Sequence, residues 1–193
     1  MQISTLRIIA GLYRGRRLIG PPGLDTRPLP DRIKQSLFDW LGQDLSGLRV
    51  ADVCAGSGTF GLEAASRGAA EVVLIEAGRH AVSALNANLT ALGHPPEVRL
   101  ALRMFQQVLP TLKGFDLIFA DPPFPWFTEN VAALDELMVL AAAALAPGGR
   151  LVIRGERGHD LPPAPSIYLT PETRFYGRSW VRILRTRAAI PAP

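Results

Sequence analysis

Five apolar segments alternate with helical segments between residues 48 and 154, and this alternation restricts the fold more than any other feature of the chain. Each apolar segment is five or six residues long, which is typical of a strand buried on both faces of a sheet. Strands that alternate with helices form a mostly parallel sheet with helices on both faces. The expected strands are Leu48–Val53, Glu71–Ile75, Val98–Leu102, Phe115–Ala120 and Arg150–Arg154.

The segments between these strands have the apolar spacing or the alanine content of helices. The last helix is expected to stop before Pro147, since proline and two glycines follow it. One expected helix follows the glycine-rich segment and ends near Ser66, and the others span Ala81–Leu92, Phe105–Leu112 and Glu129–Ala146.

Two further strands are expected near the C-terminus. After a proline-rich loop, Ser166–Leu169 and Ser179–Thr186 are predicted to pair antiparallel and to close the sheet. Residues 48–187 then form one α/β domain, and residues 188–193 are predicted to be a flexible tail.

Residues 1–47 are predicted to form a small basic extension ahead of this domain. Leu6–Gly11 and Arg16–Ile19 are expected to form a short hairpin, and four prolines between residues 21 and 30 then favour extended chain. Asp31 is the expected N-cap of a helix that continues to Leu41, because apolar residues recur there at helical spacing.

Positive charge is concentrated at the two ends of the sequence. Residues 1–34 carry six arginines and one lysine against two aspartates, and residues 150–193 carry eight arginines against three acidic side chains. The residues between them carry six basic and twelve acidic side chains, so the net charge is only +4. Basic flanks around an acidic middle indicate a polyanionic partner. A GC-rich genome explains the preference for arginine over lysine equally well, but it does not explain the clustering.

Simple counts disfavour several other classes of protein. No apolar segment approaches the roughly 18 residues that a membrane span needs, and the N-terminus lacks a signal-peptide pattern. Cys54 is the single cysteine, so no disulfide forms within the chain, and the three histidines lack the spacing of metal ligands. We therefore expect a cytoplasmic, monomeric protein that binds no metal and no membrane.

A glycine-rich loop lies between the first strand and its helix. Gly56–Gly61 matches G-x-G-x-x-G, and Glu76 follows Gly56 by twenty positions, at the end of the second strand. This arrangement binds an adenosine-bearing cofactor, and a dinucleotide fits it as well as S-adenosylmethionine does. Asp52 favours S-adenosylmethionine, because its carboxylate repels a pyrophosphate and attracts the cationic methionine end of that cofactor.

Asp121-Pro122-Pro123-Phe124 follows the fourth strand, at the edge of the sheet where α/β proteins bind ligands. The Asp121 carboxylate and the Pro122 carbonyl are predicted to accept the two N–H bonds of an aromatic amine and to aim its nitrogen at a methyl donor. Pro123 stiffens the loop, and Phe124 offers a face on which a flipped base stacks. The segment predicts methylation of an exocyclic amine on a nucleic-acid base, with Asp121 as the holder of that amine.

With both motifs in place, the chain resembles the class I methyltransferases and, more closely, the bacterial 16S ribosomal RNA guanine-N2 methyltransferase family of the RsmD type. The resemblance extends from about Arg7 to Arg187, and its N-terminal elements distinguish this family from enzymes with a similar core. The matching segments are Arg7-Ile8-Ile9-Ala10-Gly11, Arg14-Gly15-Arg16, Arg27-Pro28, Asp31-Arg32, Leu37-Phe38-Asp39-Trp40-Leu41, Ala55-Gly56-Ser57-Gly58, Gly61-Leu62-Glu63-Ala64, Ile75-Glu76 and Asp121-Pro122-Pro123-Phe124.

The resemblance implies a Rossmann-like fold with a seven-stranded sheet, S-adenosylmethionine as the cofactor, and a guanine N2 of small-subunit ribosomal RNA as the methyl acceptor. The RNA is then presented by the small ribosomal subunit or by its assembly intermediates. The implied base-handling residues are Asp121, Pro122, Pro123 and Phe124. The implied cofactor contacts are Asp52, Ala55, Gly56, Gly58, Glu76 and, through its backbone, Met104. The candidate RNA contacts are Arg7, Arg14, Arg16, Arg17, Arg27, Arg32 and Lys34.

The chain departs from the family pattern at three places. Leu29-Pro30 replaces the usual threonines, Gly78 replaces a polar residue after Glu76, and Met104 stands where a polar residue usually meets the adenine amine. Two other functions remain open. One is the same chemistry on adenine N6 or cytosine N4 of DNA or other RNA, or on a glutamine amide. The other is a catalytically idle RNA-binding assembly factor.

Overall fold

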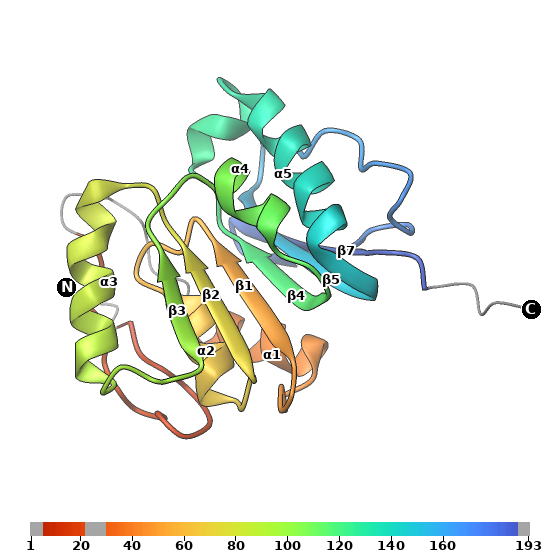
Figure 1. Ribbon diagram of the computed structural model, residues 1–193. Helices are drawn as coiled ribbons and strands as arrows, with labels where there is room; N and C mark the ends of the chain where they lie inside the picture. The colour runs from red at the N-terminus through yellow and green to blue at the C-terminus, as the bar shows by residue number, and fades with distance from the viewer. Residues whose placement is uncertain (1–5, 22–29, 189–193) are drawn as a thin grey trace, which may run out of the picture.

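The computed structural model describes residues 6–21 and 30–188. Within them, seven strands form one sheet: β1 (Arg49–Val53), β2 (Glu71–Ile75), β3 (Val98–Ala101), β4 (Phe115–Ala120), β5 (Leu145–Glu156), β6 (Glu172–Tyr176) and β7 (Ser179–Arg185). The strand order is β3-β2-β1-β4-β5-β7-β6 (Figure 1). The first five strands are parallel, whereas β7 is antiparallel to both β5 and β6. The order reverses between β1 and β4, the place where open α/β sheets bind ligands.

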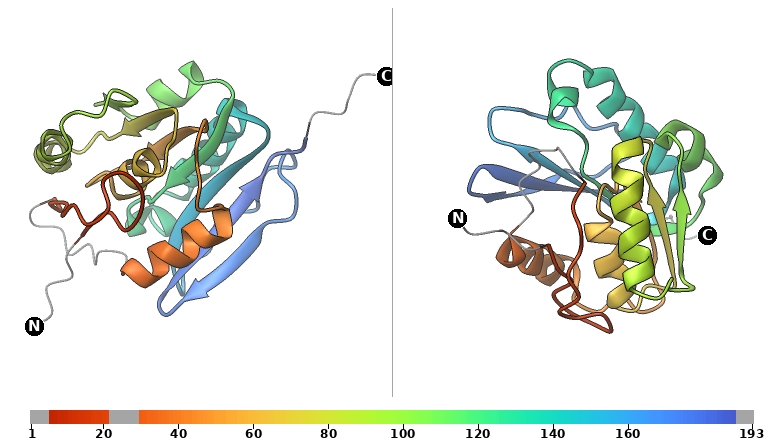
Figure 2. Two further views of the ribbon diagram at one scale, coloured as in Figure 1. Left: turned by 90° about the horizontal axis from the view of Figure 1, so that it is seen from below. Right: turned by 90° about the vertical axis from the view of Figure 1, so that its left-hand side faces the viewer.

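Helices cover both faces of the sheet (Figures 1 and 2). The first three helices pack on one face, and the remaining two, with a 3-10 turn, pack on the other. The helices are α1 (Asp31–Leu41), α2 (Thr59–Ser66), α3 (Arg79–Ala91), α4 (Phe105–Val108) and α5 (Val131–Ala144), and the 3-10 helices are η1 (Leu109–Thr111) and η2 (Phe124–Phe127).

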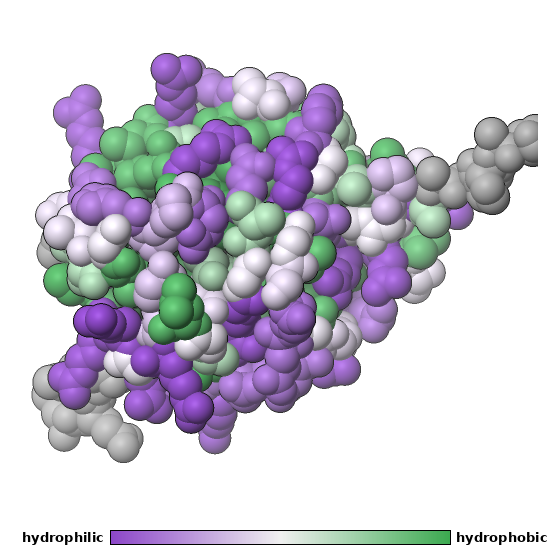
Figure 3. Space-filling view, turned by 60° about the horizontal axis from the view of Figure 1, so that its bottom comes forward, coloured by the Kyte–Doolittle hydropathy of each residue, from purple (hydrophilic) through white to green (hydrophobic). Residues whose placement is uncertain are grey.

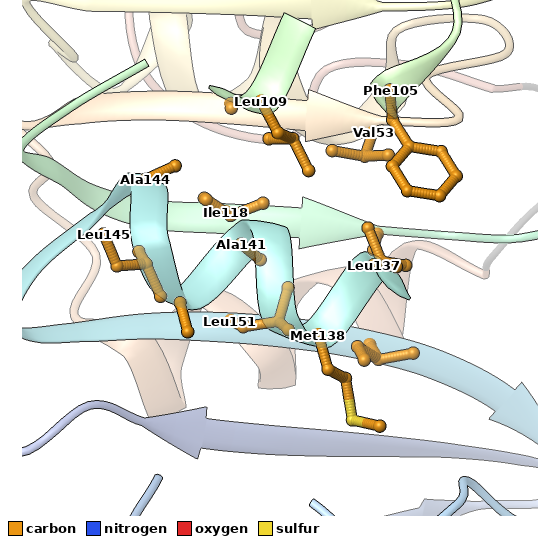
Figure 4. Packing of buried hydrophobic residues seen from close by; sticks show 14 of the residues in the cluster. Val53, Phe105, Leu109, Ile118, Leu137, Met138, Ala141, Ala144, Leu145 and Leu151 are labelled. Atoms are coloured by element: carbon orange, nitrogen blue, oxygen red, sulfur yellow. The ribbon is translucent and has the colours of Figure 1, made fainter. Parts of the chain in front are cut away.

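The two-residue period of the strands divides the core into two layers. Val50 and Leu117 belong to the layer under α1, α2 and α3, whereas Ile118 belongs to the layer under α4 and α5. In Figure 4, α5 crosses β4 and β5 with Met138 and Ala141 against the sheet. Each large apolar side chain buried in these layers contributes roughly 1.5–3 kcal/mol.

The N-terminal hairpin is present, but its two arms pair over a shorter stretch than expected. Arg7 and Arg17 form one antiparallel bridge, and the Ile8 N–H donates to the Arg16 carbonyl at 2.9 Å. The hairpin is attached to α2, because the Leu12 N–H donates to the Ser66 carbonyl at 2.8 Å and the Tyr13 N–H to the Ser66 hydroxyl at 2.9 Å. The expected N-cap is wrong by one residue: Pro30 is the N-cap of α1, and Asp31 is the first residue of the helix. The Asp31 carboxylate accepts a hydrogen bond from Arg7.

The antiparallel end of the sheet differs from the prediction. β6, and not Ser166–Leu169, is the partner of β7, because the two-residue Gly177-Arg178 turn joins them and Gly177 adopts a φ of 61°. Ser166–Leu169 contributes only a bridge from Tyr168 to Thr186.

The helix expected over Glu129–Ala146 is also shorter than predicted. α5 ends at Ala144, and β5 begins at Leu145 and runs through the proline and glycines. The residues that follow β7 hold the extended Pro-Gly-Gly segment in place. The Gly148 N–H donates to the Arg187 carbonyl, and the Thr186 N–H donates to the Gly149 carbonyl. No helix in the described ranges is long and apolar enough to cross a membrane.

Candidate active site

Three strands, β1, β2 and β4, end at one edge of the sheet, where β5 continues past them, and polar residues from distant parts of the chain meet there. Val53 of β1 pairs with Ile75 of β2 and with Ala120 of β4, and Ala120 in turn pairs with Ile153 of β5. The residues that follow these positions therefore lie side by side across this edge, which we call the catalytic edge. They are Cys54, Glu76, Asp121 and Arg154.

The glycine-rich loop is held in shape by Glu76. One carboxylate oxygen accepts the Gly56 N–H at 2.8 Å, and the other accepts the Gly78 N–H at 2.6 Å. Position 58 requires a glycine, since its φ is 77° and a Cβ there would lie 2.8 Å from the Leu85 side chain. The Glu76 carboxylate therefore fixes the loop through a backbone N–H, and the N–H of Gly78, a departure from the family pattern, holds the other oxygen of that carboxylate.

Asp52 carries a buried oxygen that lacks a partner. Its side chain is 1% exposed, and Oδ2 accepts the Gly61 N–H at 2.8 Å, whereas Oδ1 has no hydrogen-bond partner in the described part of the chain. Burial raises the pKa of the Asp52 carboxyl well above its usual range, and the charges of Asp121 and Glu76 raise it further. A site with three acidic side chains suits a cationic ligand and opposes a pyrophosphate.

Cys54 lies between these acids. Burial raises the pKa of its thiol, and the charges of Glu76 and Asp121 raise it further, so the side chain stays an uncharged thiol at neutral pH. An uncharged thiol is a poor nucleophile, so Cys54 is not a candidate catalytic nucleophile.

Asp121 has a partner that the sequence interpretation missed. Arg154 of β5 donates from Nε to Oδ1 and from a terminal nitrogen to Oδ2, both at 2.7 Å. Burial lowers the pKa of the Arg154 guanidinium, but the charge and hydrogen bonds of Asp121 outweigh this effect and raise it. The signal in the sequence was an arginine that directly follows the apolar Leu151–Ile153 run of the strand next to β4.

Pro122 leaves a carbonyl available beside this carboxylate. A turn carbonyl normally accepts an N–H three residues later, but Pro125 has none. The Trp126 N–H donates instead to the Pro123 carbonyl at 2.9 Å, and no backbone N–H in the described ranges donates to Pro122. The loop thus contains a carboxylate and, in the next residue, a carbonyl that accepts no backbone hydrogen bond in the described ranges.

Aromatic residues surround this loop. Phe124 is half-buried, with the Arg154 guanidinium 5.8 Å from its ring centroid. Trp126 packs against Phe105 with ring centroids 5.8 Å apart, whereas Phe127 is buried against Trp180 and belongs to the core. Met104, at the start of α4, is 55% exposed, and its cofactor contact stays a prediction.

Part of the predicted arginine set lines a cleft of about 280 Å³ between the hairpin and the start of α1. Arg7, Arg14 and Arg32 line it together with Asp31, which pairs with Arg7 at 2.6 Å. The other hairpin arginines, at positions 16 and 17, are exposed, and Arg27 lies outside the described residues.

Lys34 was wrongly predicted as an RNA contact. Its side chain is 2% exposed, its Nζ lies 3.0 Å from the Glu63 carboxylate, and it donates to the Arg7 carbonyl. Burial lowers the pKa of Lys34, while the Glu63 charge opposes this shift. The residue joins α1, α2 and the hairpin, and an RNA phosphate has no access to it. Helical spacing offered a clue, since Lys34 lies on the same face of α1 as Leu37 and Phe38.

A second group of arginines, not assigned from the sequence, surrounds the β6–β7 turn. Arg174 stacks on Trp40 at 4.1 Å and Arg157 on Phe175 at 5.0 Å, and Phe175 itself is 60% exposed. Ser179 pairs with Glu156 just beyond Arg154, so this turn lies at the catalytic edge.

Comparison with known proteins identifies the family. The family described as Conserved hypothetical protein 95 matches residues 6–185. The chain belongs to this family. A relative is Ribosomal RNA small subunit methyltransferase D of Haemophilus influenzae, 39% identical over 88% of this chain and 84% of the relative. The Escherichia coli protein of the same name is 32% identical over 96% of this chain and 92% of its own length.

Solved structures agree with this family. The Escherichia coli protein YhhF has a TM-score of 0.79 and 29% identity, covering 95% of this chain and 99% of that one. A SAM-dependent O-methyltransferase from Thermotoga maritima shares the fold with a TM-score of 0.62 and 17% identity, covering 87% of this chain and 69% of that one. The resemblance to the RsmD type is confirmed, and the protein is a methyltransferase with the class I fold.

Proposed function

We propose that the protein transfers the methyl group of S-adenosylmethionine to N2 of a guanine in small-subunit ribosomal RNA. The relatives named above act, by their names, on small-subunit ribosomal RNA. The observation that carries the proposal is the acceptor pair beside the acid-lined loop, formed by the Asp121 carboxylate and the Pro122 carbonyl. An exocyclic amine has two N–H bonds, and this pair matches them.

The cofactor is proposed to lie over the glycine-rich loop. The unpartnered Asp52 oxygen and the neighbouring acids support a cationic ligand. Glu76 is proposed to accept a ribose hydroxyl with the lone pairs that the Gly56 and Gly78 N–H groups leave free. Ala55, Gly56 and Gly58 supply the backbone of the cradle, and Met104 adds a backbone contact. When bound, S-adenosylmethionine supplies a methyl group on a cationic sulfur.

The Asp-Pro-Pro-Phe loop is proposed to hold the acceptor base. Asp121 and Pro122 accept the amine hydrogens and so aim the nitrogen lone pair, while the carboxylate favours the positive charge that develops on nitrogen. Phe124 stacks on the flipped base, a contact worth roughly 1–3 kcal/mol. Pro123 keeps the loop stiff. The methylated amine is acidic while cationic, so its proton leaves without a strong base.

RNA is proposed to lie along α1, between the two arginine groups. Arg32, in the first turn of α1, lines the hairpin cleft, and Trp40, in the last turn, carries Arg174 of β6. Figure 3 shows strongly hydrophilic residues over the lower half of this side of the molecule. Arginine suits phosphate because its planar fork donates two parallel hydrogen bonds. The remaining parts of the proposal are a small subunit or assembly intermediate as substrate, a cytoplasmic monomer, and no metal.

The test offers tritiated S-adenosylmethionine to the enzyme together with naked 16S RNA, small subunits, DNA or protein extract. Label is expected in RNA or subunits, and nucleoside analysis of the product is expected to show N2-methylguanosine. Label in DNA or protein alone, or in N6-methyladenine or N4-methylcytosine, contradicts the proposal. RNA binding with no transfer at all would support the idle assembly factor.

Asp121→Ala tests the role of the carboxylate. Transfer is expected to fall at least about 100-fold, the usual loss when one group that stabilises developing charge is removed. Cofactor affinity, measured by calorimetry, is expected to stay within a factor of a few. Asp135→Ala, on the exposed side of α5, is the matched control and is expected to keep full activity. Near-normal turnover of the Asp121 variant contradicts its assigned role.

A further inference from the structure

The guanidinium of Arg154 donates two hydrogen bonds to the carboxylate of Asp121, which is proposed to hold the substrate amine. Both hydrogen bonds measure 2.7 Å, and the Arg154 side chain is only 12% exposed. The pair follows from register, since Ala120 lies beside Ile153 in the parallel sheet and the next residues are Asp121 and Arg154. Two parallel hydrogen bonds to one carboxylate fix its rotation as well as its position.

We propose that Arg154 is a positioning residue for methyl transfer, which holds the Asp121 carboxylate in place and correctly rotated to receive the acceptor amine. The inference rests on the proposed function. A carboxylate has about four acceptor sites, and the guanidinium fork occupies two. Asp121 therefore keeps sites for one amine hydrogen, while Pro122 accepts the other. The same guanidinium lies 5.8 Å from the Phe124 ring centroid, so one side chain orders both base-handling residues.

The surrounding charges explain why Asp121 needs this partner. Asp52 of β1 and Glu76 at the end of β2 are acidic, and the Cys54 thiol between them carries no charge. Glu156, further along β5, interacts with Arg154. Without Arg154, the Asp121 carboxylate loses the two hydrogen bonds that orient it and is left beside these acids. It is then free to rotate away from the position in which it accepts the amine hydrogen.

Three replacements separate the charge of Arg154 from its geometry. Arg154→Gln removes the charge and keeps a donor, Arg154→Met removes both, and Arg154→Lys keeps the charge without the fork. In Arg154→Gln and Arg154→Met, kcat is expected to fall roughly 100-fold, the loss typical of a misplaced catalytic group. KM for cofactor is expected to change little. In Arg154→Lys, kcat is expected to recover in part but to stay below the wild-type value, because the charge is kept without the planar fork.

A purely structural role would lower the amount of folded enzyme and leave kcat per folded molecule and the KM for cofactor unchanged. Thermal unfolding and S-adenosylhomocysteine binding measure the folded fraction of each variant. Wild-type kcat per folded molecule in Arg154→Gln or Arg154→Met overturns the proposal.

A second measurement does not depend on the RNA substrate. The carboxyl carbon of Asp121 is observed by NMR in protein labelled at aspartate, with Asp121→Asn used to assign the signal. Its chemical shift is expected to change in Arg154→Gln, because the bidentate pair with the guanidinium is lost, and an unchanged shift overturns the inference. If wild type transfers no methyl group to RNA but the NMR shift is observed, the proposed substrate fails while the pairing of Arg154 with Asp121 stands.

Discussion

Glu63→Gln is expected to destabilise the protein strongly, because Glu63 is the buried anion that joins the hairpin to the domain. Its side chain is fully buried and accepts the N–H groups of Ile9 and Ala10 at 2.9 and 3.0 Å. It also pairs with Lys34 at 3.0 Å and with Arg67 at 2.9 Å. Glutamine retains one acceptor but leaves two buried cations without an anion.

The magnitude follows from these contacts. Loss of one partner from a buried ion pair costs about 3–5 kcal/mol, and here two cations lose the same partner. At about 2–4 °C per kcal/mol for a domain of this size, the melting temperature is expected to fall by at least about 10 °C. Glutamine at Glu71 is the matched control, because Glu71 pairs with Arg49 and Arg99 while 29% exposed, where a pair contributes about 1 kcal/mol or less.

Urea and thermal unfolding of both variants measure the difference. If Glu63→Gln loses less than about 1 kcal/mol, or no more than Glu71→Gln, then the buried network is not what anchors the hairpin. RNA binding offers an independent reading, since a detached hairpin is expected to weaken RNA affinity without changing the affinity for the cofactor.

Two further predictions concern the cofactor and RNA surfaces. In Asp52→Asn, cofactor affinity is expected to fall roughly 10- to 100-fold through loss of a charged partner, as calorimetry will show. Folding raises the Asp52 pKa, so the cofactor-free wild type loses stability as pH rises through the raised pKa and the buried carboxyl ionises. Asp52→Asn is therefore expected to have a higher melting temperature than the wild type at pH 7. A lower melting temperature contradicts the reasoning. Glutamine at Arg157, Arg174 and Arg178 is expected to reduce the slope of log affinity for RNA against log salt by roughly 0.7 per lost phosphate contact, whereas glutamine at Arg99, on the opposite edge strand, leaves it unchanged.

The parallel part of the sheet was predictable because its strands are apolar on both faces. The expected strands Glu71–Ile75 and Phe115–Ala120 are the observed β2 and β4. β6 was not predictable in this way, since Glu172–Tyr176 is an edge strand with exposed, charged residues. Its pairing depends on the Gly177-Arg178 turn and on neighbours from β7 and α1, which a periodicity argument does not contain.

Lys34 shows a second kind of limit. A lysine in a basic segment indicates a surface charge, and the prediction followed that rule. Its burial depends on Glu63 and on the Arg7 carbonyl, which come from two other elements and meet only in the folded chain. A buried charge is stable only when such partners are supplied, and a local pattern does not show whether they are.

The sequence by itself determined the sheet type, the position of the glycine-rich loop, and the meeting of Asp52, Glu76 and Asp121 at one edge. The reason is that residues that follow parallel apolar strands must emerge on the same side of the sheet. Only the tertiary structure decided which cation lies against Asp121, because Asp121 and Arg154 are 33 positions apart in the sequence and are brought together by the register of β4 and β5. Strand order and register are properties of the assembled core, where side chains from the whole chain pack together.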